Sequence, residues 1–237
     1  MSGHDLLEEL AREPSRAALC LDVDGVLAPI VERPEDALVP EETRAELARL
    51  AARYALVAAI SGRTSDEARR IVGVPRLVYV GSHGLELSRD AERWRAALQI
   101  FLASVEWPVE NKGLTASFHY RTAPDEAAAK AALDAVATRA EQAGLRARFG
   151  RKVLEVIPPI EADKGTAVRQ LLAERKLRRA FYAGDDTTDL DGFAALDGLD
   201  VGVRVAVSSA EGPRELRERA DVVVDGPPEF LELLRSL

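Results

Sequence analysis

The stretch that decides the fold is Leu19-Cys20-Leu21-Asp22-Val23-Asp24-Gly25-Val26-Leu27. The apolar run Ala17–Leu21 is too short for a helix, so it predicts a buried strand. Asp22 and Asp24 follow that strand directly, and their charges would repel and lose water there. Acids in this place are typical of the edge of an α/β sheet where ligands bind. We therefore expect a divalent cation beside them, with Asp22 free to act as a nucleophile.

The composition of the 237 residues excludes several classes of protein. Hydrophobic residues make up 47% and charged residues 30%, which is typical of globular proteins. A net charge of -8 without a basic stripe argues against a nucleic-acid partner. The sequence contains no apolar run of membrane-spanning length, and we find no signal peptide at its start. A lone cysteine, Cys20, fits a reducing compartment, so we expect a cytoplasmic protein. We also expect a monomer.

Both ends of the chain alternate between strand-like and helix-like segments. This alternation predicts a Rossmann-like parallel sheet with helices on both faces. The expected strands are 17–21, 55–60, 77–80, 180–183 and 221–224, and the expected helices are 5–12, 41–54, 65–72, 164–176 and 228–237.

The middle of the chain has a different pattern. Residues 115–121 alternate as a half-exposed strand does, 124–144 form an alanine-rich helical segment, and 145–151 and 152–157 are typical of two adjacent strands. A strand, a helix and a pair of strands indicate a small α+β layer. We therefore expect an inserted domain at 89–160, between two parts of a core domain at 1–88 and 161–237.

Polar residues follow four of the predicted element boundaries and complement one another chemically. Asp22, Asp24 and the acidic turn 185–191 offer the oxygen ligands that Mg²⁺ prefers. Ser61, and Lys164 at the start of a helix, can bind phosphate oxygens. In such a site Asp22 can attack phosphorus, and Asp24 can protonate the leaving oxygen and then deprotonate water.

Each of these segments also has an ordinary explanation when it is taken alone. Asp-x-Asp-Gly is common in turns, and Ser61 can be a helix cap. A calcium loop is excluded because Arg33 stands where an EF-hand needs a bidentate glutamate. The sequence also lacks the glycine-rich loops of nucleotide-binding proteins and the G-x-S-x-G elbow of serine hydrolases. The two acid clusters, each following a strand, together favour a catalytic site.

The segments 22–25, 61–63, 164–165 and 184–189 resemble, in order, the four motifs of the haloacid dehalogenase superfamily. The resemblance implies a HAD-like core with an inserted cap domain of the C2B-like type. It also implies that Asp22 is the nucleophile and Asp24 the acid/base, with Ser61 and Lys164 completing the catalytic set. Mg²⁺ would be held by Asp22, the Asp24 carbonyl and Asp185, with Asp189 in support.

A narrower resemblance, to trehalose-6-phosphate phosphatases, is carried by the segments 24–30, 81–86, 119–121, 153–156 and 184–189, together with Lys112. It implies a sugar-phosphate substrate, contacted by residues from this set: Arg63, His83, Lys112, His119, Arg151, Lys152 and Glu155. The sequence leaves open which of Arg151 and Lys152 faces the sugar. Three positions depart from the usual pattern of the family: Val26, Ile157 and Leu190.

The sequence therefore predicts an Mg²⁺-dependent phosphatase that hydrolyses trehalose 6-phosphate through an aspartyl-phosphate. Two alternatives share its chemistry: a phosphatase for another sugar phosphate, such as a glucosyl- or mannosyl-glycerate phosphate or sucrose phosphate, and a phosphomutase. An alternative of another class is a phosphosugar-binding or aspartyl-phosphate regulatory protein with little turnover. Asp24 argues against a pure receiver, because an acid/base group hastens the loss of a phosphoryl group.

Overall fold

The computed structural model describes residues 2–150, 152–209 and 212–237. The chain forms two compact units, one of Met1–Gly84 with Ala162–Leu237 and the other of Leu85–Glu161. The domain boundaries expected from the sequence stay predictions. Among the described helices, none is long and apolar enough to cross a membrane.

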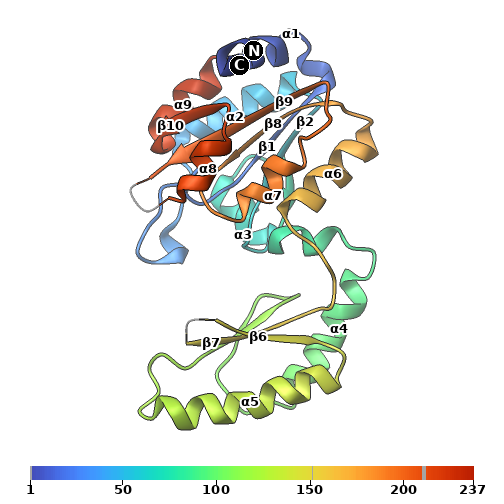
Figure 1. The fold of residues 1–237 in the computed structure, drawn as a ribbon, viewed down its shortest axis with the longest axis vertical. Coiled ribbons are helices and arrows are strands. Elements are labelled where there is room, and N and C mark those ends of the chain that lie inside the picture. Colours follow the sequence, from blue (N-terminus) through green and yellow to red (C-terminus); the bar gives the residue numbers. More distant parts are fainter. Residues whose placement is uncertain (1, 151, 210–211) are drawn as a thin grey trace. The chain divides into compact units, whose positions relative to one another are not determined.

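The first unit is built on a six-stranded parallel sheet, as the strand–helix alternation predicts (Figure 1). In sheet order the strands are β10 (Val222–Asp225), β9 (Val201–Ser208), β8 (Arg179–Gly184), β1 (Ala17–Leu21), β2 (Leu56–Ile60) and β3 (Val78–Val80). All five residues of β1 are buried, because helices cover both faces of the sheet. Strand β9 is absent from the sequence-based prediction, although its valines alternate with other residues.

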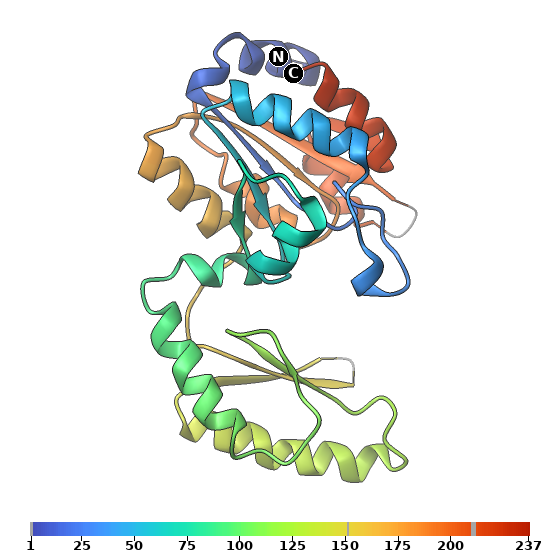
Figure 2. The same cartoon turned by 180° about the vertical axis from the view of Figure 1, so that it is seen from behind.

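Helices lie on both faces of this sheet, and successive side chains of each strand point to opposite faces. Figure 1 shows α6 (Lys164–Arg175) and α7 (Asp189–Ala194) in front of the sheet, and Figure 2 shows α2 (Glu41–Arg53) in front when it is seen from behind. The main core lies on the second face, where Leu19 and Leu21 of β1 pack with residues of other helices. Those helices are α1 (Gly3–Arg12), α2, α3 (Ser65–Val72) and α9 (Gly226–Arg235). Each fully buried leucine contributes about 2 kcal/mol.

The remaining elements of the first unit are short. Helix α8 (Arg214–Arg219) contacts β9, and the 3-10 turns η1 (Pro14–Arg16) and η2 (Pro34–Asp36) lie in connections. A further 3-10 turn, η3 (Ser82–Leu87), begins in this unit and ends in the second. The turn η2 belongs to the loop that follows β1, and η3 follows β3. Both loops leave the sheet at the carboxyl ends of their strands, so they border the edge where the acids lie.

The second unit is an α+β layer, as its sequence pattern predicts. Its antiparallel sheet has the order β4 (Glu110–Asn111), β5 (Ala116–His119), β7 (Val153–Ile157) and β6 (Arg146–Gly150). Helices α4 (Ala91–Leu102) and α5 (Glu126–Gln142) share one apolar core with alternate strand residues such as Phe118 and Leu154. The strand residues that alternate with these core residues, including His119 and Glu155, therefore point to the face of the sheet away from that core. Helix α4 is not among the helices predicted from the sequence.

Candidate active site

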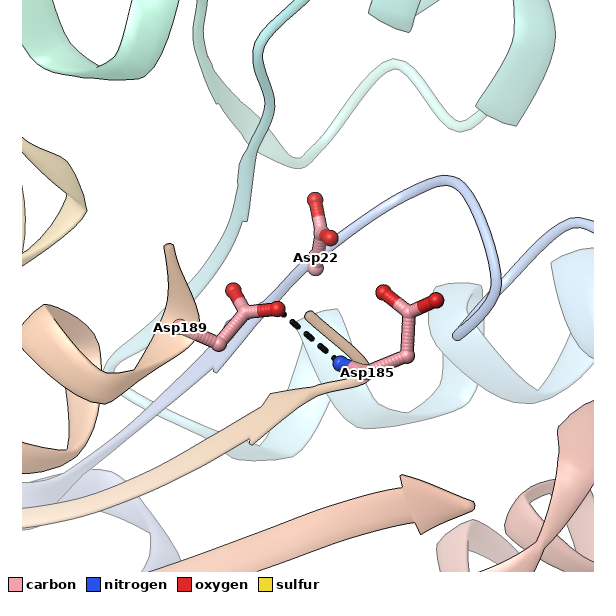
Figure 3. A group of neighbouring side chains, drawn as sticks. All are labelled: Asp22, Asp185 and Asp189. Carbon is pink, nitrogen blue, oxygen red and sulfur yellow. Dashed lines mark hydrogen bonds between the residues drawn. The ribbon is translucent and has the colours of Figure 1, made fainter. Parts of the chain in front are cut away.

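Three carboxylates meet at the carboxyl edge of the parallel sheet (Figure 3). Asp22 follows β1, Asp185 follows β8, and Asp189 begins α7. Strands β1 and β8 are neighbours, and Leu21 lies opposite Ala183, so both chains leave the sheet at the same level. Carboxylate oxygens of the three residues lie within 4.8 Å of one another. Oxygen donors of this kind suit a hard cation such as Mg²⁺.

Lys164 links two of these acids. Its Nζ atom lies 2.9 Å from Oδ2 of Asp22 and 2.8 Å from Oδ1 of Asp189, and the lysine side chain is only 3% exposed. The lysine opens α6, whose first turn is closed by a capping box between Asp163 and Thr166. The cap fixes the start of the helix and so fixes the point from which the lysine reaches the acids.

The carboxylate of Asp189 already accepts four hydrogen bonds from within the protein. Its Oδ1 accepts from the hydroxyl of Tyr182 at 2.7 Å as well as from Lys164. Its Oδ2 accepts from the backbone N–H groups of Asp185 and Asp186 at 2.9 and 3.0 Å, the first of which is drawn in Figure 3. These bonds fix the turn after β8 and hold Asp185 at the edge.

Gly25 allows the loop after β1 to approach Asp185. It has φ +77°, and a Cβ atom at this position would lie 2.0 Å from Oδ2 of Asp185. The tight turn is closed by a hydrogen bond from the N–H of Gly25 to the carbonyl of Ala28 at 2.8 Å. A side chain would therefore conflict with both the backbone conformation and the acidic cluster.

Burial changes the ionisation of the cluster. It raises the pKa of Asp22 to about 8, with the charges of Asp189 and Asp185 adding to the rise and Lys164 opposing it. Burial, followed by the charge of Asp189, raises the pKa of Asp185 to about 6. For Lys164, burial lowers the pKa, but the charges of Asp22 and Asp189 outweigh it and raise the pKa. The single positive charge of Lys164 does not balance the three carboxylates, and a divalent cation would balance the remaining negative charge.

Asp24 lies outside this cluster and is bound to Arg63. The Nε and Nη2 atoms of Arg63 donate to the two carboxylate oxygens of Asp24 at 2.7 and 2.8 Å. Arg63, which the resemblance makes a sugar contact, is therefore paired with the expected acid/base. The roles of Asp24, including that of its carbonyl as a metal ligand, stay predictions.

Ser61 and His83 lie on two loops that are tied together. Ser61 is 1% exposed and follows β2, next to β1 in the sheet. The carbonyl of Ser61 accepts from the N–H of His83 at 2.9 Å, and the carbonyl of Arg63 accepts from the N–H of Ser82 at 2.7 Å. Ser82 and His83 have φ values of 51° and 53°, which side chains rarely adopt and which often occur at functional sites. A Cβ on Gly62 would meet Nε2 of His83 at 2.6 Å, so glycine lets the imidazole lie against this loop.

Three of the other predicted sugar contacts lie in the second unit, near the helix-free face of its sheet. His119 and Lys112 both lie against the Glu110 carboxylate, at 3.0 and 3.4 Å. Glu155 accepts from Nε of Arg148 at 2.6 Å. The sequence-based set does not include Glu110 or Arg148. Arg148 could have been found, because it lies between Ala147 and Phe149 in a predicted strand and pairs with Glu155 of the neighbouring strand.

The two remaining candidates are Lys152, which directly precedes β7, and Arg151. Lys152 has φ +63° and forms an ion pair at 2.9 Å with Glu126 at the start of α5. It is therefore turned toward the helix. Arg151 lies outside the described residues, so its role stays a prediction.

Solved structures of other proteins share this fold. A trehalose-6-phosphate phosphatase from Aspergillus fumigatus matches with a TM-score of 0.67 at 24% identity, over 100% of this chain and 97% of that one. A haloacid dehalogenase-like hydrolase from Bacteroides thetaiotaomicron matches with a TM-score of 0.58 at 15% identity, over 93% and 98% of the two chains. The parallel sheet with its antiparallel insertion is thus a haloacid dehalogenase-like hydrolase fold, as the motifs predict.

The family follows from the sequence comparisons. The family model described as trehalose-phosphatase matches residues 20–224. The chain is also 32% identical to probable trehalose-phosphate phosphatase D of Arabidopsis thaliana, over 100% of this chain and 71% of that protein. The chain belongs to the trehalose-phosphatase family of hydrolases.

Proposed function

We propose that this protein is an Mg²⁺-dependent phosphatase that hydrolyses trehalose 6-phosphate to trehalose and phosphate. The observation that carries the proposal is the buried group of Asp22, Lys164 and Asp189 beside Asp185, in a chain of the trehalose-phosphatase family. Such a group offers a nucleophile, a fixed positive charge and a cation site within one edge of a sheet.

In the proposed reaction a carboxylate oxygen of Asp22 attacks phosphorus. The bond from phosphorus to the sugar oxygen breaks, its electron pair stays on that oxygen, and Asp24 supplies the proton. Asp24 then takes a proton from water, the water oxygen bonds to phosphorus, and the bond to Asp22 breaks. Phosphate is released and Asp22 is regenerated. Lys164 keeps Asp22 oriented, and together with Ser61 it stabilises charge on the phosphoryl oxygens.

The acids fit Mg²⁺ as the cofactor. Asp22 and Asp185 would hold the ion, and Asp189 would support the turn that carries Asp185. When bound, Mg²⁺ would neutralise the acids and the phosphoryl group and so make an approach between them favourable. The negative charge of the cluster and its raised pKa values support this choice.

Sugar recognition is assigned to the second unit, which we interpret as a cap domain. The polar side chains near its helix-free sheet face, Lys112, His119, Arg148 and Glu155, offer donors and acceptors suited to sugar hydroxyls. The pairing of Lys152 with Glu126 makes Lys152 the weaker candidate of this group. The expectations of a monomer and of a cytoplasmic location belong to the same proposal, and the buried free thiol of Cys20 agrees with a reducing compartment.

A phosphate-release screen over a panel of phosphorylated sugars, with and without Mg²⁺, tests the function. The expected result is release from trehalose 6-phosphate well above that from glucosyl- or mannosyl-glycerate phosphate and sucrose phosphate, and only with the cation. Higher release from another sugar phosphate would overturn the substrate. Saturable binding without release would identify a phosphosugar-binding protein, and conversion to an isomeric sugar phosphate would identify a mutase.

A further inference from the structure

The Asp24 carboxylate is held by one partner through two hydrogen bonds. Arg63 donates to both of its oxygens, at 2.7 and 2.8 Å, in the fork geometry that a guanidinium and a carboxylate form best. The pair is only partly exposed, at 19% for Arg63 and 37% for Asp24. Two parallel bonds fix the plane of a carboxylate as well as its position, which a single bond does not.

Arg63 is itself fixed from several directions. Its Nη1 atom donates to the carbonyl of Pro34 at 2.9 Å, and its backbone N–H donates to Oγ of Ser61 at 3.1 Å. Its carbonyl accepts from the N–H of Ser82. The guanidinium therefore joins the loop after β1 to the loop after β2, and each of its three nitrogens has a partner. A side chain held in this way is suited to orienting another residue and poorly suited to following a substrate.

We propose that Arg63 is a positioning residue for the proton transfers of Asp24, and not a sugar contact. The proposal rests on the proposed function, because it assumes that Asp24 exchanges a proton with the leaving oxygen and then with water. Each carboxylate oxygen has two lone pairs, and Arg63 engages one on each. A lone pair thus remains on each oxygen to carry the proton, while the guanidinium keeps the carboxyl plane in one orientation.

Substrates with different leaving groups can distinguish a positioning role of Arg63 from a substrate contact and from a purely structural role. An alkyl oxygen, as in a sugar phosphate, needs a proton when it departs, whereas the nitrophenolate of p-nitrophenyl phosphate leaves without one. Arg63→Ala should therefore lower kcat for trehalose 6-phosphate by about ten- to a hundredfold and leave KM almost unchanged. In rapid mixing with p-nitrophenyl phosphate, the first turnover should release nitrophenolate at the wild-type rate. Later turnovers should slow, because Asp24 must still activate water.

Arg33→Ala is the matched control. Arg33 also binds an aspartate through two nitrogens, Asp36 at 2.8 and 3.1 Å, but that pair is exposed and its bonds do not include Asp24. This variant should keep the wild-type rates on both substrates. Arg63→Lys keeps the charge without the fork, so its kcat should lie between those of the wild type and Arg63→Ala. In an Asp24→Asn background, Arg63→Ala should cause no further loss, since the residue it positions no longer transfers protons.

Three outcomes would overturn the proposal. A raised KM for trehalose 6-phosphate with unchanged kcat would make Arg63 a substrate contact. An equal loss in the first turnover on both substrates, in a variant with wild-type melting temperature, would make its role purely structural. Full additivity with Asp24→Asn would separate the two residues. A wild-type protein that turns over p-nitrophenyl phosphate but not trehalose 6-phosphate would instead contradict the proposed substrate, and the comparison would be repeated with whichever alkyl phosphate it hydrolyses.

Discussion

The Nζ atom of Lys164 lies 2.9 Å from Oδ2 of Asp22, and both side chains are buried. Removing a carboxylate from water is costly unless a partner of opposite charge lies close to it. One ammonium group here serves Asp22 and Asp189, with Asp185 beside them, so the ionised group keeps an excess of two negative charges. A divalent cation would balance that excess. The ion that the proposed reaction needs would therefore also stabilise this edge of the sheet.

Lys164→Met should both destabilise the protein and reduce its activity. The variant leaves two buried carboxylates without their cation, and breaking a buried ion pair from one side costs about 3–5 kcal/mol. Denaturant unfolding measures the loss. The control is Lys130→Met, which removes an exposed pair with Asp134 at 3.0 Å and should cost no more than about 1 kcal/mol. Equal losses in the two variants would contradict a special role for the buried lysine.

Asp22→Asn should abolish turnover and leave the fold intact. The amide is not a nucleophile, so phosphate release should fall at least ~10³-fold. Because the substitution removes one of three neighbouring negative charges, the melting temperature of the cation-free protein should not decrease. Phosphate release and thermal unfolding are measured on the same preparation. Substantial release by this variant would remove Asp22 from its proposed role.

Gly25→Ala should disrupt the acidic cluster, and the chain contains a close control. Gly25 and Gly198 have nearly the same φ, +77° and +78°, so alanine carries a similar backbone strain of about 1–2 kcal/mol at both. A Cβ on Gly25 meets the Asp185 carboxylate, whereas a Cβ on Gly198 has no atom of the described residues within 4 Å. Only Gly25→Ala should therefore weaken Mg²⁺ binding and phosphate release. If titration with Mg²⁺ gives the same affinity for both variants, the contact with Asp185 is unimportant.

The stabilisation of the protein by Mg²⁺ should increase with pH. The raised pKa values, about 8 for Asp22 and about 6 for Asp185, mean that the folded protein retains protons that the unfolded chain releases above about pH 4. The free energy of unfolding of the cation-free protein therefore falls as the pH rises from about 4 to 8. Bound Mg²⁺ compensates for the lost protons, so the rise in melting temperature on its addition should be larger at pH 8 than at pH 5.5. Equal rises, with sodium chloride as the ionic-strength control, would contradict these pKa values.

The parts of the fold that the sequence predicts are those in which one local signal is sufficient. The run Ala17–Leu21 is an uninterrupted apolar segment, and the strand spans those residues. Parallel strands end at a common edge, so the meeting of Asp22 with Asp185 follows once the strands are recognised. In β9 the residues Gly202 and Arg204 interrupt the apolar pattern, and that strand is missing from the prediction.

The side-chain partners are harder to predict because they depend on geometry between distant segments. The spacing of Arg63 and Asp24 in the sequence does not indicate that they meet. Their contact needs the loop after β1 to bring Pro34 close to the end of β2. The partner of Lys152 likewise depends on its positive φ, which turns it toward Glu126. Motifs thus locate the site, while loop conformation decides which groups are bound to one another.

Glu155→Ala should reduce the turnover of trehalose 6-phosphate far more than that of p-nitrophenyl phosphate. Glu155 lies on the helix-free sheet face with Arg148, where its loss removes a charged acceptor for sugar hydroxyls. Hydrogen bonds to charged groups contribute about 1.5–3 kcal/mol, so kcat/KM for the sugar phosphate should fall about ten- to a hundredfold. The control is Glu126→Ala in the same unit, which removes a comparable ion pair with Lys152 on the helix side and should leave both substrates unaffected. Equal losses on the two substrates in Glu155→Ala would place this residue outside sugar recognition. Equal effects of Glu155→Ala and Glu126→Ala would show that the helix-free face is not the sugar-binding surface.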